Sequence, residues 1–252
     1  MTPFSNHHPN YNRLPDRLSA KYKKNMVDCL RSFFNWLLRW GELKELPIMP
    51  EIQTPDSIPR RAISYEEQLE ALANIPFEHR GFIEFMMETG LRPGEACALK
   101  ISDINSKDKT MIVQRTYSEH VLRETTKGRH KMRVPLSDRA YELIKESIGD
   151  TIGDRFVFIN PATKKGYVPE TIRKVWKKYS RSDVDMYSAT RHSFCTQLVE
   201  MGMSEIEAQG IMRHKDARST RSYFHPTQER QRGFLNQRGK VIPFKKVNNL
   251  ED

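Results

Sequence analysis

Residues 188–198 read Ser188-Ala-Thr-Arg-His-Ser-Phe-Cys-Thr-Gln-Leu198, and the organisation of the chain can be followed outward from this stretch. Its apolar residues recur at helical spacing, which predicts a helix that carries Arg191 near its start. The next segment, Gly210-Ile-Met-Arg-His-Lys-Asp-Ala-Arg-Ser-Thr-Arg-Ser-Tyr-Phe-His225, places His214 after a short helix and Tyr223 further along. An arginine, a histidine and a tyrosine are therefore expected from two neighbouring segments.

A second arginine comes from Glu88-Thr-Gly-Leu-Arg-Pro-Gly-Glu95, where the proline fits the first turn of a helix and places Arg92 at its mouth. A guanidinium is permanently charged, and its planar fork matches two phosphate oxygens. Clustered carboxylates that would hold magnesium are missing from the sequence. We therefore expect Arg92 and Arg191 to stabilise a phosphodiester under attack by Tyr223, with no metal or other cofactor.

Each of these residues has an ordinary structural alternative. A lone tyrosine is usually a core or interface residue, and a lone arginine in a basic chain is usually solvated. Lys127, in the predicted turn 127–130, could protonate the leaving oxygen or contact a base edge, or simply be exposed. His214 could bind a phosphate oxygen or pack as a neutral ring. Only the combination of these residues favours a catalytic function.

Composition narrows the class of partner. The chain has 252 residues, of which 37% are hydrophobic, and its net charge is +10. This charge favours a polyanionic partner, with nucleic acid favoured over a membrane surface, although a merely basic protein is an equal alternative. No apolar run is long enough to cross a bilayer. Three scattered cysteines indicate reduced thiols, and we expect a cytoplasmic, nucleoid-associated protein.

The periodicity predicts an α+β fold, mostly helical with a small antiparallel three-stranded sheet. The expected helices are 19–41, 64–74, 81–89, 93–99, 137–149, one from Pro169, one carrying Arg191, and 205–212. The expected strands are 111–113, 120–126 and 131–135, the last two joined by the turn at 127–130. Residues 155–159 could form a further strand or a buried connector.

Four segments are predicted along the chain. They are a disordered tail and remnant helical domain at 1–45, a proline-rich linker at 46–62, the main domain at 63–231 and a polar tail at 232–252. Arg60 and Arg61, at the end of the linker, could contact a DNA backbone or be a solvated pair.

Five segments resemble the motifs of tyrosine recombinases, the phage-integrase family. Thr89–Glu95 and Arg191–Thr196 resemble its two arginine boxes. The hairpin lysine, the late histidine and the nucleophilic tyrosine of that family resemble residues of 126–136, 212–216 and 220–223. The motifs come in the family's order and cover about 63–244, and the helix at 19–41 resembles the end of the family's helical core-binding domain.

The resemblance implies a site-specific DNA recombinase or integrase whose catalytic residues are Arg92, Lys127, Arg191, His214 and Tyr223. It also implies a 3′-phosphotyrosyl intermediate, a free 5′-hydroxyl, and no need for ATP or a metal. The family acts as homotetramers on paired double-stranded DNA sites, in some cases with accessory DNA-bending proteins, and often passes a C-terminal segment to a neighbour. Residues 241–244 are the expected segment.

Two residues depart from the family pattern. Ser188 stands where the family usually has a histidine, and Arg213 stands where a glycine is common. We expect Ser188 beside Arg191 at the DNA, unless the helix begins only at Thr190 and turns the serine away. A catalytically weakened or non-catalytic DNA-binding relative is therefore the alternative function. A nicking-closing enzyme resembling type IB topoisomerases is a more remote one.

Overall fold

The computed structural model describes residues 17–54, 61–118, 121–124, 131–150 and 153–213, together with the single residues 216, 217, 220, 223, 232 and 236. The chain divides into two compact units, residues 1–59 and 60–252, and each is described by itself.

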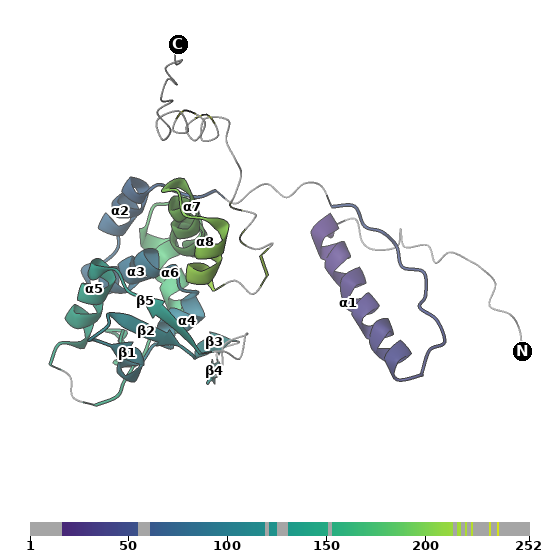
Figure 1. Cartoon of the computed structure of the whole chain (residues 1–252), viewed down its shortest axis with the longest axis horizontal. Helices are drawn as coiled ribbons and strands as arrows, with labels where there is room; N and C mark the ends of the chain where they lie inside the picture. The colour runs from purple at the N-terminus through teal and green to yellow at the C-terminus, as the bar shows by residue number, and fades with distance from the viewer. Residues whose placement is uncertain are drawn as a thin grey trace, which may run out of the picture. The chain divides into compact units, whose positions relative to one another are not determined.

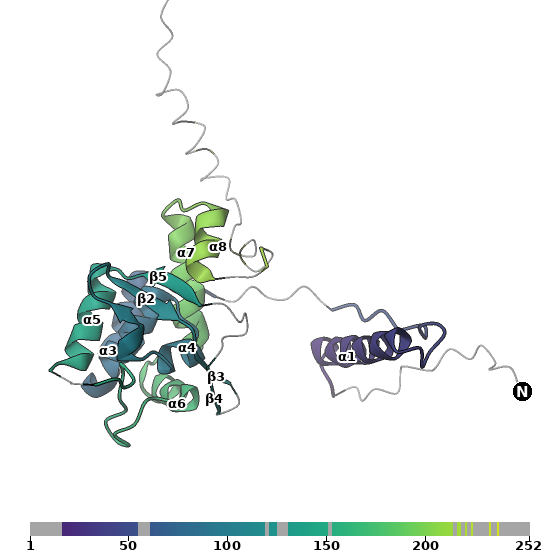
Figure 2. The ribbon, with the colours of Figure 1, turned by 60° about the horizontal axis from the view of Figure 1, so that its bottom comes forward.

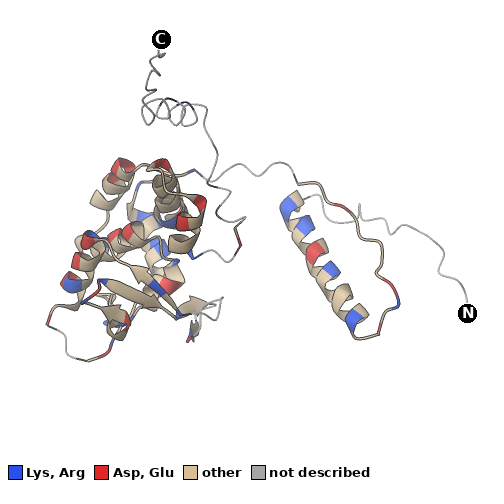
Figure 3. Cartoon of the chain, viewed as in Figure 1, with Lys and Arg blue, Asp and Glu red and all other residues tan. Residues whose placement is uncertain are grey.

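The first unit contains one described helix, α1 (Ala20–Arg39) (Figure 1). The Ser19 side chain accepts a hydrogen bond from the Tyr22 backbone N–H and caps the start of this helix. Basic and acidic residues both lie along it (Figure 3). Much of its apolar stripe is exposed, and three of the exposed side chains form a row of aromatic rings: Phe33, Trp36 and Trp40.

The second unit is built around helix α3 (Phe77–Thr89), which contacts the flanking helices on several sides. The remaining helices are α2 (Tyr65–Ala73), α4 (Pro93–Cys97), the short helix η2 (Ile101–Asp103), α5 (Asp138–Ile148), α6 (Pro169–Tyr179), the π-helical segment η3 (Ser188–His192), α7 (Ser193–Glu200) and α8 (Glu205–Met212). Figures 1 and 2 show α7 and α8 side by side. One continuous hydrophobic core joins α2 to α6 and the sheet.

The sheets are small and antiparallel. A three-stranded sheet has the order β1 (Ile104–Asn105), β2 (Thr110–Val113), β5 (Met132–Pro135), with Met111 opposite Val134. A separate two-stranded sheet pairs β3 (Thr116–Ser118) with β4 (Val121–Arg123). The fold class and its three-stranded sheet are confirmed.

The strand pairing differs from the prediction, because β1 and β3 are additional strands and β1 takes the place in the three-stranded sheet expected for 120–126. The strand expected at 120–126 is β4, and it pairs with β3 and not with β5. Residues 155–159 form a connector that is buried at Val157 and Phe158 and has isolated bridges at Phe156 and Ile159. The turn predicted at 127–130 lies outside the described residues.

Several helix starts follow their caps. Ser64 and Ser204 form capping boxes at the starts of α2 and α8, and Ser137 caps α5. Helix α3 begins four residues earlier than predicted, directly after Pro76. Among the described residues, no helix has the length and apolar character needed to span a membrane.

Candidate functional site

The turn that carries Arg92 is fixed by a glycine. Gly90 ends α3 with a left-handed φ of 57°, and a Cβ there would lie 2.4 Å from a ring carbon of Phe194 on α7. Any other residue would therefore be strained in backbone and in packing. Pro93 then begins α4, so that Arg92 stands at the helix mouth, as the sequence predicts.

Glu95 holds Arg92 from within α4. Its carboxylate accepts hydrogen bonds from the Arg92 backbone N–H at 3.1 Å and from Arg92 Nη1 at 2.9 Å. The Glu95 side chain is 6% exposed and the Arg92 side chain 43% exposed. Glu95 therefore has two functions, because it caps the helix and also orients the arginine.

Arg191 lies in the π-helical segment η3. Met186 and Tyr187 are already helical, so the helix begins before Ser188 and not at Thr190. The Ser193 backbone N–H donates to the carbonyl oxygen of Ser188, five residues back, and this spacing makes the turn wider than that of an α-helix. A π segment adds a residue to the turn and so changes the direction of the side chains beside it.

Buried polar side chains stabilise this wide turn. The Ser193 hydroxyl donates to the Ser188 carbonyl at 2.8 Å, and the Gln68 side-chain amide donates to the Ala189 carbonyl at 2.6 Å. Ser193 also accepts from the Ile63 backbone N–H at 2.9 Å. The start of α2 is thereby tied to the segment that carries Arg191.

Arg191 joins three parts of the chain. Its side chain is fully buried, and Nη1 donates to the Gly90 carbonyl at 2.6 Å while Nη2 donates to the Met212 carbonyl at 2.5 Å. The Nε atom has no hydrogen-bond partner within the described part of the chain. One guanidinium thus binds the turn before Arg92 and the end of α8, two residues before His214 in the sequence.

The charges around Arg191 identify its neighbours. Burial lowers the pKa of Arg191, and the charge of Arg92 lowers it further, whereas Tyr187, Glu95 and Tyr223 act in the opposite direction. Arg92, Arg191 and Tyr223 are therefore close enough to interact electrostatically. An arginine keeps its charge at neutral pH despite such a shift.

Tyr223 lies against the π-helical segment. Its ring centroid is 4.9 Å from that of His192, with the planes tilted by 45°. Its backbone N–H donates to the Thr220 carbonyl at 3.0 Å, in a turn that begins at the buried Thr220. The phenol is half-buried and so lies beside the arginine segment without being enclosed by it.

A third arginine, Arg213, lies in the same site. Its Nη2 donates to Glu95 Oε2 at 3.1 Å, and its side chain is 3% exposed. Burial lowers the pKa of Arg213 to about 10, against the opposing effect of Glu95. Burial raises the pKa of Glu95, but attraction to Arg213, Arg92 and Arg191 outweighs burial and holds it below its usual value.

Ser188 is buried and directed toward the chain itself. Its hydroxyl donates to Asp185 Oδ2 at 2.9 Å, and its backbone N–H donates to Asp185 Oδ1 at 3.0 Å. Asp185 thus caps the helix and engages the serine hydroxyl. Contact between Ser188 and DNA stays a prediction.

The remaining candidates are placed as follows. Lys127, His214 and Arg60 lie outside the described residues. Arg61 forms ion pairs with Glu67 and Asp183, and its side chain is 52% exposed. Its predicted contact with DNA stays a prediction, in competition with these two carboxylates.

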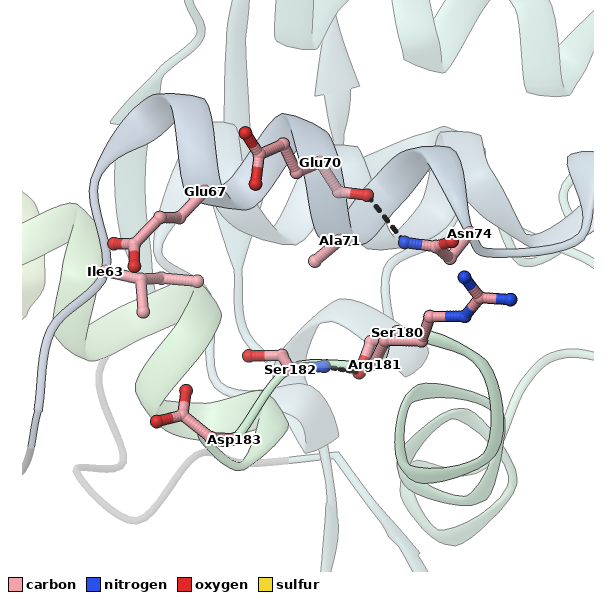
Figure 4. A pocket seen from close by; sticks show the side chains of 9 residues that line it. All are labelled: Ile63, Glu67, Glu70, Ala71, Asn74, Ser180, Arg181, Ser182 and Asp183. Atoms are coloured by element: carbon pink, nitrogen blue, oxygen red, sulfur yellow. Dashed lines mark hydrogen bonds between the residues drawn. The ribbon is translucent and has the colours of Figure 1, made fainter.

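A pocket of about 290 Å³ lies near Arg61, between α2 and the turn 180–183 (Figure 4). Glu67, Glu70 and Asn74 line it from the helix. It includes none of the candidate site residues. Within the described chain, no three histidine, cysteine, aspartate or glutamate residues are grouped to hold a metal ion.

Sequence reasoning missed two contributors to the site. Gln68 gave no signal beyond its place on α2, and its bond to Ala189 spans 121 residues. Arg213 was visible only as a departure from a resembled motif, and its bond to Glu95 spans 118 residues. The site therefore brings Arg92 and Arg213 onto one carboxylate with Arg191 close by, and of these three arginines Arg92 is the one open to solvent.

The chain is similar in sequence to known proteins. The protein-family model described as "Phage integrase family" matches residues 62–230. Tyrosine recombinase XerC of Bacillus pumilus is 28% identical over 234 residues, which cover 84% of this chain and 72% of that protein. Tyrosine recombinase XerD of Halalkalibacterium halodurans is 26% identical over 226 residues, which cover 82% and 71%.

Solved structures share the fold. A Tn1549 transposon integrase in complex with circular intermediate DNA has a TM-score of 0.72 at 20% identity and covers 88% of this chain and 80% of that one. A lambda integrase dimer bound to a COC′ core site has a TM-score of 0.60 at 17% identity and covers 91% and 63%.

Proposed function

The chain belongs to the phage integrase family, and from this premise we propose that it is a site-specific DNA recombinase that forms a 3′-phosphotyrosyl link through Tyr223. The observation that carries the proposal is the bridge made by Arg191. Its guanidinium binds the Gly90 and Met212 carbonyls, so that the turn of Arg92 and the segment before His214 meet at one buried cation. Tyr223 is close enough to this cation to interact with it.

In the proposed step, the phenolic oxygen of Tyr223 attacks the phosphorus in line and forms a new P–O bond. The bond from phosphorus to the 5′ oxygen breaks, and that oxygen leaves with its electron pair. Arg92 and Arg191 stabilise the negative charge that develops on the non-bridging oxygens. The phenol loses its proton to a base, for which His214 is the candidate, and Lys127 gives a proton to the leaving oxygen.

The reverse step joins strands. The 5′-hydroxyl of a partner strand attacks the phosphotyrosine, and the tyrosine oxygen leaves and recovers a proton. The phosphodiester is thereby conserved, and the proposal needs neither ATP nor a metal.

The assembly and setting are also part of the proposal. Two duplexes must be paired for strand exchange, which favours a homotetramer, with accessory DNA-bending proteins as further partners. The likeness to a transposon integrase supports a role in moving a mobile element. We also propose a cytoplasmic, nucleoid-associated location, because the proposed substrate is the DNA of the chromosome or of a mobile element.

The deciding experiment traps the covalent intermediate. The full chain is incubated with a library of nicked duplexes of random sequence, in which the short cleaved strand diffuses away and prevents religation. Adducts are denatured and isolated, and their DNA is sequenced to read the preferred site. We expect adducts at one sequence class with the wild-type chain and none with Tyr223→Phe, because only the hydroxyl is lost.

Tyr187→Phe is the matched control. Its phenol also lies close to the Arg191 charge, so the substitution removes a hydroxyl from the same surroundings. It should keep forming adducts. A wild-type chain that binds DNA without any adduct would support the non-catalytic relative, and cleavage without pairing of two duplexes would support the nicking-closing enzyme.

A further inference from the structure

Arg213 occupies a backbone conformation that an arginine rarely adopts. It follows the last residue of α8 with φ 55° and ψ 42°, in the left-handed region. In this conformation a Cβ crowds the following carbonyl oxygen, so an arginine is strained there, whereas a glycine adopts it freely. The arginine side chain must therefore contribute something that a glycine would not.

The contribution is a contact with the carboxylate that holds Arg92. Arg213 Nη2 donates to Glu95 Oε2 at 3.1 Å, and the same oxygen accepts from the Arg92 backbone N–H at 3.1 Å. Oε1 accepts from Arg92 Nη1 at 2.9 Å. Glu95 is thus fixed from both sides, by the helix mouth and by the end of α8.

The two arginines differ in access. The Arg213 side chain is 3% exposed and the Arg92 side chain 43% exposed, with Glu95 between them at 6%. Arg213 is enclosed and reaches the site through the carboxylate, while Arg92 is open to a substrate. Two nitrogens of Arg213 donate hydrogen bonds, Nη2 to Glu95 and Nη1 to the Ile211 carbonyl at 3.3 Å. The Nε atom of Arg213 has no partner among the described residues.

We propose that Arg213 is a positioning residue for Arg92: it clamps the Glu95 carboxylate and thereby holds the Arg92 guanidinium ready for the phosphate. The inference rests on the proposed function for its reaction and on the geometry alone for its contacts. Without the clamp, Glu95 keeps Arg92 but loses its second anchor, so that the carboxylate and the guanidinium turn together.

A purely structural role for Arg213 makes a different prediction. If Arg213 only supports the end of α8, its replacement should lower the cleavage rate by the same factor whether or not Arg92 is present. A clamp that acts on Arg92 has no effect once Arg92 is removed.

The test is a double-mutant cycle on single-turnover cleavage of the trapped substrate. We expect Arg213→Met and Arg213→Gly each to lower the rate about tenfold, with DNA affinity changed less than twofold. In the Arg92→Ala background the same changes should lower the rate less than twofold. Arg213→Lys should recover most of the rate, because a single nitrogen contacts Glu95.

Two further variants keep the test clear of folding effects. Arg213→Gly relieves the left-handed strain and remains folded if the methionine variant does not. Arg139→Met is the matched control, because it removes an arginine whose Nε lies 2.6 Å from Glu84 Oε1, away from the site. It should leave the rate unchanged. Equal losses in both backgrounds, or no loss in either, would overturn the proposal.

A second readout does not depend on cleavage. The heteronuclear NOE of the Arg92 Nε–H group reports how firmly its guanidinium is held. It should fall in Arg213→Met and Arg213→Gly and recover in Arg213→Lys. A wild-type chain that forms no adduct would defeat the proposed function, while an unchanged Arg92 NOE would defeat the positioning role.

Discussion

Arg92 and Arg191 carry the same cation in opposite surroundings. Arg92 stands at the open mouth of α4 and is held by the Glu95 carboxylate, whereas Arg191 is fully buried in a π-helical segment and is held by two backbone carbonyls. A carboxylate that holds an arginine at the surface orients it for a substrate. An arginine that donates to carbonyls of distant segments holds those segments together, and it also supplies a positive charge.

The largest effect is expected from substitution of Arg191, which joins three segments of the chain. Arg191→Lys and Arg191→Ala should each lower single-turnover cleavage by about 100-fold or more, the scale for losing one strong transition-state donor. The lysine has one nitrogen where the guanidinium uses two to reach the Gly90 and Met212 carbonyls. We expect one of these buried carbonyls to lose its bond, which costs about 1–3 kcal/mol of unfolding free energy. Urea unfolding measures the second effect. Arg173→Lys, an exposed arginine of α6, is the control and should change neither quantity.

At the surface arginine, chemistry and stability should separate. We expect Arg92→Ala to lower cleavage by about 100-fold. Its unfolding free energy should fall by only about 1 kcal/mol, because the side chain is 43% exposed and Glu95 keeps its hydrogen bond from Arg213. Arg92→Lys should rescue poorly, since an ammonium lacks the fork. A destabilisation as large as that of Arg191→Lys would erase the contrast between the two arginines.

A smaller effect should appear in acid. The three arginines hold the pKa of Glu95 below its usual 4.5 despite the opposing effect of burial. Its charge therefore contributes stability that is present above the unfolded pKa and is lost as the pH falls through the folded one. The stability gap between the wild-type chain and Glu95→Gln should narrow between about pH 6 and pH 3.

Urea unfolding at several pH values measures this gap. Glu70→Gln, an exposed glutamate of α2, serves as the control. If the stability difference between the wild-type chain and Glu95→Gln stays constant with pH, the charge of Glu95 does not stabilise the turn that carries Arg92.

The smallest effect is expected at Ser188. Its hydroxyl donates to Asp185, so Ser188→Ala should change cleavage less than about threefold, the scale of one net hydrogen bond. Ser188→His should destabilise the chain, because the site is 3% exposed and an imidazole overfills it. Cleavage that falls tenfold in the alanine variant at unchanged stability would instead place the hydroxyl on the DNA.

The sequence predicted what local chemistry determines. Ser64, Ser137 and Ser204 cap the helices that follow them, and Gly90 ends α3, because caps and left-handed turns depend on the residues themselves. The helical period predicted α8 to the residue.

What the sequence could not predict depends on distant partners. The pairing of β3 with β4 joins two strands of three residues each, too short for a period to show. The π turn keeps the apolar spacing of a helix, and its stabilising contact from Gln68 comes from another helix. Arg213 has no local preference for a left-handed conformation, and the carboxylate that engages it lies on α4.

The π-helical segment also determines which genetic changes the chain can accept. A π turn holds one residue more than a regular helical turn, so deletion of one residue between Ser188 and His192 would restore a regular helix while the helix beyond it keeps its direction. The loss would fall within the turn, where the Gly90 and Met212 carbonyls depend on the direction of the Arg191 side chain. An inserted residue would meet a turn that is already widened, and it would rotate α7 by about 100°, which would move Phe194 from its place against Gly90. Over evolutionary time the segment should therefore lose a residue more readily than it gains one.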